Sequence, residues 1–193
     1  DNSDVSLHPM LLLAVLTAAS AAPPLPRGND DFRLGMFRAQ VDSAVAARKL
    51  PVISSGSAYL VCGSDDTAVE YEQYSFFQAP HGLTFLWKVT IGYRLATSSD
   101  DLDHVLAGLE RQLGEPASDT GDAPEPNTLA GTPPPLAARN VIWADPLTAV
   151  QLGARWGAEY ERKADRMMVT WTDRRLQRLV DARRKQGKGE EKE

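Results

Sequence analysis

The sequence predicts an α+β protein built from two helix-then-antiparallel-sheet modules in tandem, with about three strands in each module and the helices on one sheet face. Residues 37–95 and residues 102–171 both begin with apolar residues at helical spacing and continue with apolar residues in alternation. The alternation is most regular over residues 83–95, and such one-sided strands are typical of antiparallel sheets. Hydrophobic residues make up 42% of the 193 residues, which is enough for a packed core.

The start of the chain has the pattern of an export signal. An apolar run at residues 10–16 is followed by small residues, and Ala19-Ser20-Ala21 suits cleavage before Ala22. We therefore expect residues 1–22 to hold an export signal and residues 23–33 to form a proline-rich lead-in. The mature protein is then periplasmic or secreted, without a membrane anchor, because the apolar run is too short to span a bilayer. The alternative is a retained N-terminal helix.

The first module is expected over residues 34–97. Its helix is predicted to begin near Gly35 and to end before Pro51, because proline does not continue a helix. Residues 54–57 predict a flexible turn, and Ala79-Pro80-His81-Gly82 predicts a tight one. Strands are expected at residues 58–62, 68–77 and 83–95.

The second module is expected over residues 98–185. Ser98 is predicted to cap its helix, whose apolar residues form one stripe. Gly114 and Pro116 indicate the end of this helix, since glycine tolerates the left-handed conformation and proline does not continue a helix. Residues 117–138 are rich in Pro, Gly, Thr and Asp, which predicts a mobile loop.

Three more strands and a last helix are expected after this loop. The strands are predicted at residues 140–144, 147–156 and 166–172, with Asp145-Pro146 as the turn between the first two. Asp173 is placed to cap a helix whose arginines face water and whose apolar residues pack down, namely Leu176, Leu179 and Val180. Residues 186–193 are expected to fray.

Short motifs of the second module resemble those of known envelope proteins. The helix end Leu113-Gly114-Glu115-Pro116, the strand Val141-Ile142-Trp143 and the strand Met167-Met168-Val169 follow the order found in BamE-like (SmpA/OmlA) lipoproteins and in the tandem modules of β-lactamase inhibitory protein. Leu34-Gly35-Met36 is the matching helix start in the first module. The resemblance implies helix-then-antiparallel-sheet domains that act by binding other proteins. It transfers no individual contact residue, and the lipid-bearing cysteine of the BamE-like group is absent.

The charge pattern favours another protein as the partner, and nucleic acid is not expected. The formal net charge is -5, which argues against a general polyanion binder. Residues 98–126 carry eight acidic residues and one arginine, whereas residues 162–188 carry ten basic residues and three acidic ones. Such asymmetry can steer a partner, and the alternative is that both stretches are solvated faces.

The sequence predicts no catalytic residue, no cofactor and no metal site. The one candidate pair is Cys62 with His81, which would make the protein a small thiol-dependent enzyme if a base lay beside the thiol. The competing interpretation is a buried structural cysteine and a histidine in a turn. The three histidines and one cysteine lack the close spacing that zinc sites favour.

Tryptophan and arginine side chains are the candidate partner contacts. Trp143 and Trp156 lie on predicted strands near the long loop, and either would be a binding hot spot if exposed, or part of the core if buried. Arg174 and Arg178 are predicted on the outer face of the last helix. We therefore expect an exported, non-enzymatic accessory or inhibitor-like protein of the cell envelope that binds another protein. The thiol-dependent enzyme and an uncleaved cytosolic regulatory module remain the alternatives.

Overall fold

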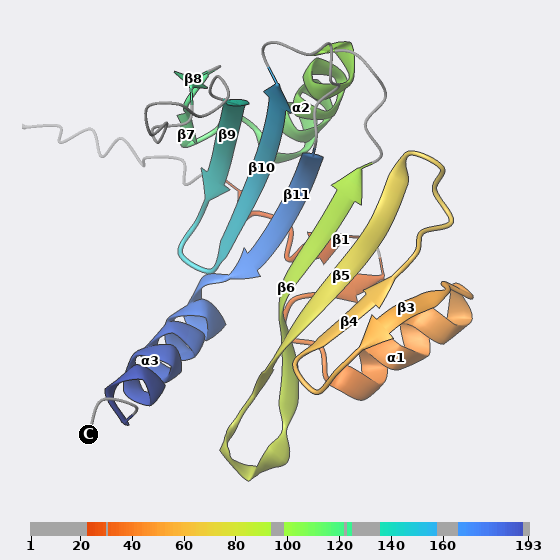
Figure 1. Cartoon of the computed structure of the whole chain (residues 1–193), viewed down its shortest axis with the longest axis vertical. Helices are drawn as coiled ribbons and strands as arrows, with labels where there is room; N and C mark the ends of the chain where they lie inside the picture. Colours follow the sequence, from red (N-terminus) through yellow and green to blue (C-terminus); the bar gives the residue numbers. More distant parts are fainter. Residues whose placement is uncertain are drawn as a thin grey trace, which may run out of the picture.

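The computed structural model describes residues 23–29, 31–93, 99–121, 123–124, 136–157 and 166–190, and these residues form a mainly β protein. Its central element is a nine-stranded sheet in the order β3-β4-β5-β6-β11-β10-β9-β7, with β8 paired to β9 off this path (Figure 1). All its strand pairs are antiparallel. The predicted export signal, residues 1–22, lies outside the described residues.

The first part of the chain forms one half of the sheet. Its elements are β1 (Gly28–Asn29), β2 (Phe32–Arg33), α1 (Arg38–Ala47), β3 (Val52–Ser55), β4 (Tyr59–Cys62), β5 (Val69–Gln78) and β6 (Thr84–Tyr93). β1 and β2 pair only with each other, and β3 to β6 form an antiparallel meander. A 3-10 turn at Pro80–Gly82 joins β5 to β6, where His81 and Gly82 both have positive φ.

The second part of the chain forms the other half. Its elements are α2 (Ser99–Leu113), β7 (Ser118–Asp119), β8 (Ala123–Pro124), β9 (Leu136–Ala144), β10 (Thr148–Gly157), β11 (Arg166–Asp173) and α3 (Arg174–Glu190). β9, β10 and β11 meander back toward the first half, and α3 follows β11 directly.

The pairing of β6 with β11 joins the two halves into one sheet. Six residue pairs connect these strands, from Met167 with Tyr93 to Thr172 with Lys88. The prediction of two tandem modules with about three strands each is therefore wrong, because the protein is mainly β with one continuous sheet. Joining two sheet edges satisfies backbone N–H and C=O groups that each separate sheet would leave unpaired. Side-chain alternation along a strand is a local property and does not identify the strand beside it.

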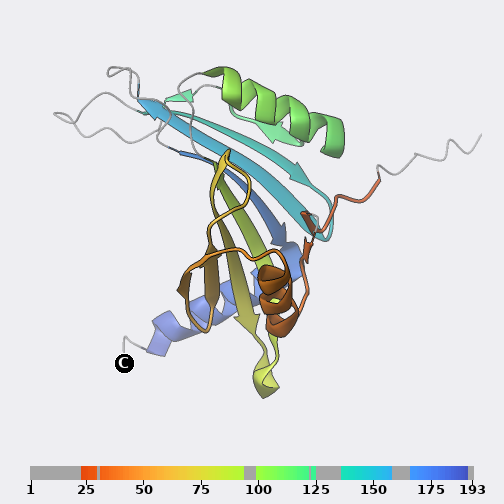
Figure 2. The same cartoon turned by 90° about the vertical axis from the view of Figure 1, so that its right-hand side faces the viewer.

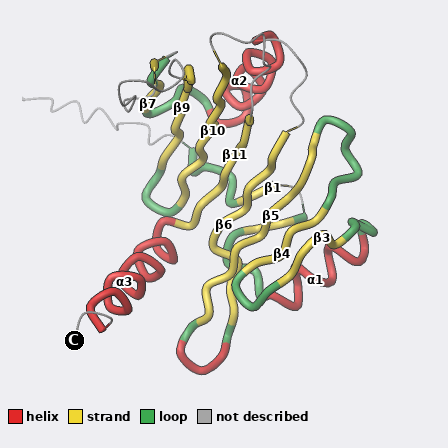
Figure 3. The backbone as a smooth tube through the Cα atoms, in the orientation of Figure 1, coloured by secondary structure: helices red, strands yellow, loops and turns green. Residues whose placement is uncertain are grey.

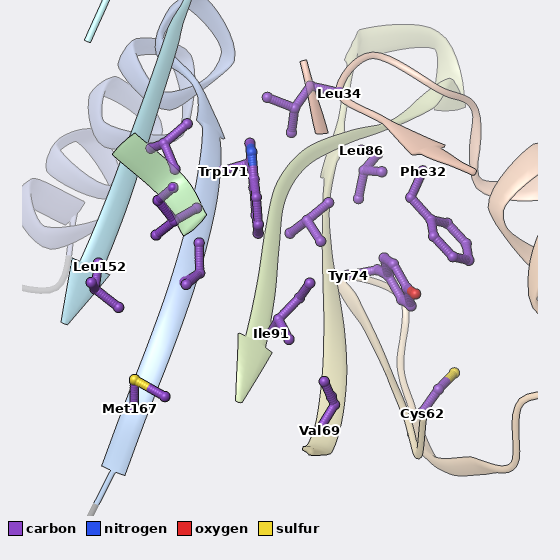
Figure 4. Packing of buried hydrophobic residues seen from close by; sticks show 14 of the residues in the cluster. Phe32, Leu34, Cys62, Val69, Tyr74, Leu86, Ile91, Leu152, Met167 and Trp171 are labelled. Atoms are coloured by element: carbon purple, nitrogen blue, oxygen red, sulfur yellow. The ribbon is translucent and has the colours of Figure 1, made fainter. Parts of the chain in front are cut away.

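The hydrophobic core lies on one face of the sheet. Register places Tyr74 of β5 beside Val89 of β6, and Val89 beside Trp171 of β11, with all three side chains buried. Figure 4 shows this layer of side chains continuing across the sheet to Leu152 of β10. The elements that cover it contribute buried residues of the N-terminal segment, α1 and α2, namely Phe32, Leu34, Val41, Val45, Leu106 and Leu109.

Helix α3 lies on the opposite face, which corrects the expectation that all helices share one face. Figure 2 shows α1 and α2 on one side of the sheet and α3 on the other. Two successive residues of β5 demonstrate the arrangement. The guanidinium of Arg38, from α1, stacks over the Phe76 ring, whereas that of Arg183, from α3, stacks over the Phe77 ring. Neighbouring strand residues point to opposite faces, so the two helices sandwich this part of the sheet.

Three local predictions are confirmed, those at Gly114, at Asp145 and at Asp173, whereas the predicted helix cap Ser98 lies outside the described residues. Gly114 follows α2 with φ of 81°, the left-handed conformation that ends a helix. The Asp145 carboxylate accepts hydrogen bonds from the N–H groups of Leu147 and Thr148, and this closes the turn between β9 and β10. Asp173 caps α3 through the N–H groups of Arg175 and Leu176.

The short strands are absent from the sequence-based prediction. β3 occupies part of the predicted turn at residues 54–57, and all its residues are exposed, so its side chains give no alternation of burial. β7 and β8 lie inside the predicted loop at residues 117–138, of which residue 122 and residues 125–135 are outside the described part. In α3, Leu179 is 52% exposed and does not pack down as predicted. Among the described helices, none has the length and apolar character needed to cross a bilayer.

Candidate functional site

A groove lies on the α3 side of the sheet, between that helix and the strands β4, β5 and β6. Its volume is about 560 Å³. We call it the α3 groove and define it by the residues that give it its chemistry, namely Tyr59, Phe77, Trp87, Val180, Arg183 and Arg184. The strands provide an aromatic side and the helix provides a cationic side, so the groove is amphipathic.

The aromatic side of the groove results from a local irregularity in the sheet. The register between β5 and β6 shifts between Ser75 and Phe76, so that Ser75 pairs with Lys88 and Phe76 with Leu86. Trp87 lies between these pairs and lines the groove together with Phe77. Both rings are nearly buried, whereas Tyr59 is 40% exposed at the margin. A bound apolar side chain would therefore contact Tyr59 and the accessible edges of the two buried rings.

Arg183 is held in a fixed position on the cationic side. Its Nη1 donates a hydrogen bond to the Gln78 carbonyl oxygen at 2.7 Å, and its guanidinium lies 5.0 Å from the centre of the Phe77 ring. These contacts limit the conformations of the side chain, so less entropy is lost when the guanidinium binds a ligand. Donors that remain unused on Arg183 are available to a carboxylate.

Arg184 adds a second charge beside Arg183. It is exposed and makes no hydrogen bond or ion pair with another residue of the described chain. The acidic residue nearest to it in the sequence of α3 is Asp181. Both carboxylate oxygens of Asp181 accept a hydrogen bond from Gln177 Nε2, at 3.0 and 3.1 Å. Lys88 brings another cation to the strand side, with its Nζ 5.7 Å from the Trp87 ring centre. The electrostatic character of the groove is therefore positive, in contrast with the net charge of the chain.

The predicted partner contacts fall at different places. Trp143 is 1% exposed, and its Nε1 donates to the Gly114 carbonyl oxygen at 2.8 Å, so its ring belongs to the core. Trp156 lies on β10, and its side chain is outside the described part of the structure. Arg174 is exposed and donates to the Asp145 carbonyl oxygen, and Arg178 is exposed on α3 outside the groove lining.

Cys62 and His81 do not lie together. Cys62 pairs with Glu72, while His81 lies beyond Gln78 in the turn at the tip of the β5–β6 hairpin (Figure 3). Glu72, opposite Cys62, and Gln78, beside the turn that holds His81, are six residues apart along β5, which corresponds to about 20 Å at the usual strand rise. Cys62 is also fully buried, and burial raises the pKa of its thiol, with a further contribution from the Glu72 carboxylate. The structure therefore does not form the thiol-base pair that a cysteine nucleophile needs.

A buried polar cluster surrounds Glu72 on the core face. Glu72 is 3% exposed and accepts hydrogen bonds from Tyr74 Oη, from both terminal nitrogens of Arg48 and from Ser64 Oγ. Arg48 also donates to Asp65 at 2.5 Å. Burial, together with the hydrogen bond to Glu72, raises the pKa of Tyr74. Because each carboxylate oxygen is occupied, the cluster fixes α1 to the β4–β5 hairpin and leaves no oxygen directed at a substrate.

Comparison with known proteins gives no match: no family model, no curated protein and no solved structure is similar to this chain. Among the described residues, no three His, Cys, Asp or Glu side chains are grouped so that they could hold a metal ion. The α3 groove combines anchored cationic and aromatic side chains, and we base the proposed function on it.

The sequence prediction included the basic helix but not the groove beside it. Val180, Arg183 and Arg184 recur at spacings of three and four, and this places them on one face of α3. That spacing was available in the sequence. The strand partners were not, because Tyr59, Phe77 and Trp87 come together only through the register of β4, β5 and β6.

Proposed function

We propose that this chain is an exported, non-enzymatic binding protein of the cell envelope, which recognises an acidic segment of another protein in the α3 groove. The observation that carries the proposal is the pairing of Arg183 and Arg184 with the aromatic residues Tyr59, Phe77 and Trp87 along one groove. Arginine and large aromatic side chains are the types most enriched in protein-binding hot spots.

The chemistry of the groove defines the segment that fits. A carboxylate can form a charge-assisted hydrogen bond with the anchored Arg183 or with Arg184. An adjacent aromatic or aliphatic side chain can pack on Tyr59 and bury apolar surface. A basic segment is disfavoured, because it would bring like charges together. The partner segment is therefore acidic, with at least one large apolar residue.

The motif resemblance is a second support. The residues Leu113–Pro116 and Trp143 belong to the pattern shared with envelope proteins that bind other proteins. The alternative of a thiol-dependent enzyme receives no support from the position of Cys62 and His81.

Peptide binding tests the groove. Two matched sets of fluorescent peptides, acidic and basic, each with one aromatic residue, are titrated with the purified protein at low and high salt. We expect acidic peptides to bind, more weakly at high salt, and Arg184→Glu to reduce their affinity by about tenfold or more. Arg178→Glu, on the same helix but outside the groove, is the matched control and should retain binding. Equal affinity of the Arg184→Glu variant and the wild type would refute the assignment.

The mass of the mature protein tests export. If the chain is expressed with its N-terminal segment in a bacterial host, cleavage before Ala22 removes residues 1–21, and the product is recovered from the periplasm or the medium. An intact chain that stays in the cytoplasm would support the uncleaved regulatory module instead. This measurement is independent of the peptide titration, so export and groove binding can fail separately.

A further inference from the structure

Strand β3 forms an edge of the sheet that no other described strand covers. Its inner side pairs with β4, and it is the last strand in the sheet order on that side. The outer backbone groups of such a strand are available to pair with another chain. Arg38 holds the end of the strand in place, since it donates to Ser55 Oγ at 3.1 Å and to the Gly56 carbonyl oxygen at 2.9 Å. The edge is therefore anchored to α1.

All four residues of this edge are exposed, and two of them, Val52 and Ile53, are apolar. Val52 is 57% exposed and Ile53 is 63% exposed, the two highest values among the large hydrophobic residues that the structure describes. No charged residue occurs between Lys49 and Asp65, a stretch of fifteen residues. Edge strands in monomeric proteins usually carry a lysine or another charge that discourages pairing. β3 has no charged residue, and its one irregularity is the shift in its register with β4 between Val52 and Ser54.

The other edge of the sheet is protected. It ends in β7 and β8, which have two residues each and pair with β9. Asp119 of β7 forms an ion pair with Arg139 of β9 at 2.9 Å. A short strand with charged side chains is a poor template for pairing, so the two edges differ in the property that governs association.

We propose that β3 pairs with β3 of a second copy of this chain, in antiparallel orientation about a two-fold axis. An identical strand brings no charged side chain of its own, so pairing buries Val52 and Ile53 with no charge on either strand. A charged partner strand would find no counter-charge between residues 50 and 64. Two-fold pairing uses the same edge of both copies and closes at a dimer. The dimer would have one sheet that continues across both copies, with an α3 groove on each.

The oligomeric state and its dependence on Ile53 test the proposal. Sedimentation velocity of the full chain is measured over a hundredfold range of concentration, for the wild type, Ile53→Lys and Leu83→Lys. Leu83 is the matched control, because it is 52% exposed and lies just before β6, at the tip of the β5–β6 hairpin. We expect a concentration-dependent dimer for the wild type and for Leu83→Lys, and a monomer at all concentrations for Ile53→Lys. Circular dichroism checks that each variant is folded.

Hydrogen exchange gives a second readout that needs no variant. Amide exchange in residues 52–55 is expected to slow as the wild-type concentration rises, while exchange at β7 stays unchanged. A wild type that is monomeric throughout the range overturns the proposal. A dimer that persists in Ile53→Lys, or one that Leu83→Lys also dissociates, shows that copies associate elsewhere and likewise overturns it. None of these outcomes depends on peptide binding in the α3 groove.

Discussion

Arg27, in the segment that precedes β1, forms an ion pair with Asp173, the residue that caps α3 and lies 146 positions later in the chain. One carboxylate oxygen of Asp173 accepts from Arg27, and the other accepts from the N–H groups of Arg175 at 2.9 Å and Leu176 at 3.1 Å. The side chain is 1% exposed. A single buried carboxylate therefore joins the N-terminal segment, the end of β11 and the start of α3.

Replacement of Asp173 by Asn should destabilise the protein. Asparagine can still cap the helix, but the variant loses the negative charge that neutralises Arg27, and we expect a loss of about 2–4 kcal/mol in the free energy of unfolding. Urea denaturation measures this change. Asp42→Asn is the control, since Asp42 is half-exposed and its ion pair with Arg38 is a surface pair whose loss should cost less than about 1 kcal/mol. Equal losses in the two variants would contradict the role of burial.

The stability contributed by Asp173 should depend on pH. Burial alone would raise the pKa of this carboxyl, but hydrogen bonds from Leu176, Arg27 and Arg175 outweigh it and lower the pKa below its usual value. A carboxyl with a lowered folded-state pKa contributes stability above its unfolded pKa of about 4 and loses this contribution as the pH falls through the folded value. The difference between the wild type and Asp173→Asn should thus be constant from neutral pH to about pH 5 and shrink below about pH 4. Urea titrations at several pH values test this expectation.

A comparison of Trp143 with Trp171 measures how much one buried hydrogen bond contributes to the stability of the protein. Both are buried, at 1% and 7% exposure, but only Trp143 has an indole donor with a partner, the Gly114 carbonyl oxygen. Trp171 Nε1 has no hydrogen-bond partner within the described chain. Trp143→Phe should therefore cost about 1 kcal/mol more stability than Trp171→Phe. Thermal and urea unfolding compare the two, and a larger loss for Trp171→Phe would contradict the assignment.

Gly92 and Gly153 distinguish a packed from an open position on strands of the same sheet. A Cβ added at Gly92 would lie 2.3 Å from a ring carbon of Tyr71, whose hydroxyl contacts Met168 Sδ at 3.3 Å, whereas at Gly153 nothing lies within 4 Å. Gly92→Ala should destabilise by about 1–3 kcal/mol because the ring must move. Gly153→Ala should be neutral or stabilising by up to about 1 kcal/mol. Unfolding measurements that reverse this order would disprove the packing of Tyr71 on Gly92.

The Cys62 thiol should react slowly in the folded protein. It is fully buried and its pKa is raised, so both access and the thiolate fraction are reduced. We expect an aromatic disulfide reagent to label it only after addition of denaturant. Ser57→Cys in a Cys62→Ala background is the control, because residue 57 is exposed and its thiol should react at once. Rapid stoichiometric labelling of native wild-type protein would show that Cys62 is accessible.

Local sequence signals predicted most of the elements but not their assembly. Alternation predicted β6, β10 and β11, strand-like composition between turns predicted β4, β5 and part of β9, and Gly114 and Asp173 predicted the end of α2 and the start of α3. The four exposed residues of β3 carry no such signal, because a strand at the sheet edge has little burial to impose alternation. The position of α3 also escaped prediction. The alternation over residues 83–95 groups Trp87 with the core residues, but the register shift between β5 and β6 places its ring on the α3 side.

The candidate site was only partly predictable for the same reason. The charge of α3 follows from its composition, and the common face of Val180, Arg183 and Arg184 follows from their spacing in a helix. Both can be determined from the sequence alone. Their aromatic counterparts lie about a hundred residues earlier, and a register shift between β5 and β6 turns Trp87 toward the helix. The amino-acid pattern thus specifies which segments become helix or strand, through interactions that act over a few residues. The pairing of β6 with β11, the union of two halves in one sheet and the groove under α3 arise from hydrogen bonds and burial between distant segments, which only folding brings into contact.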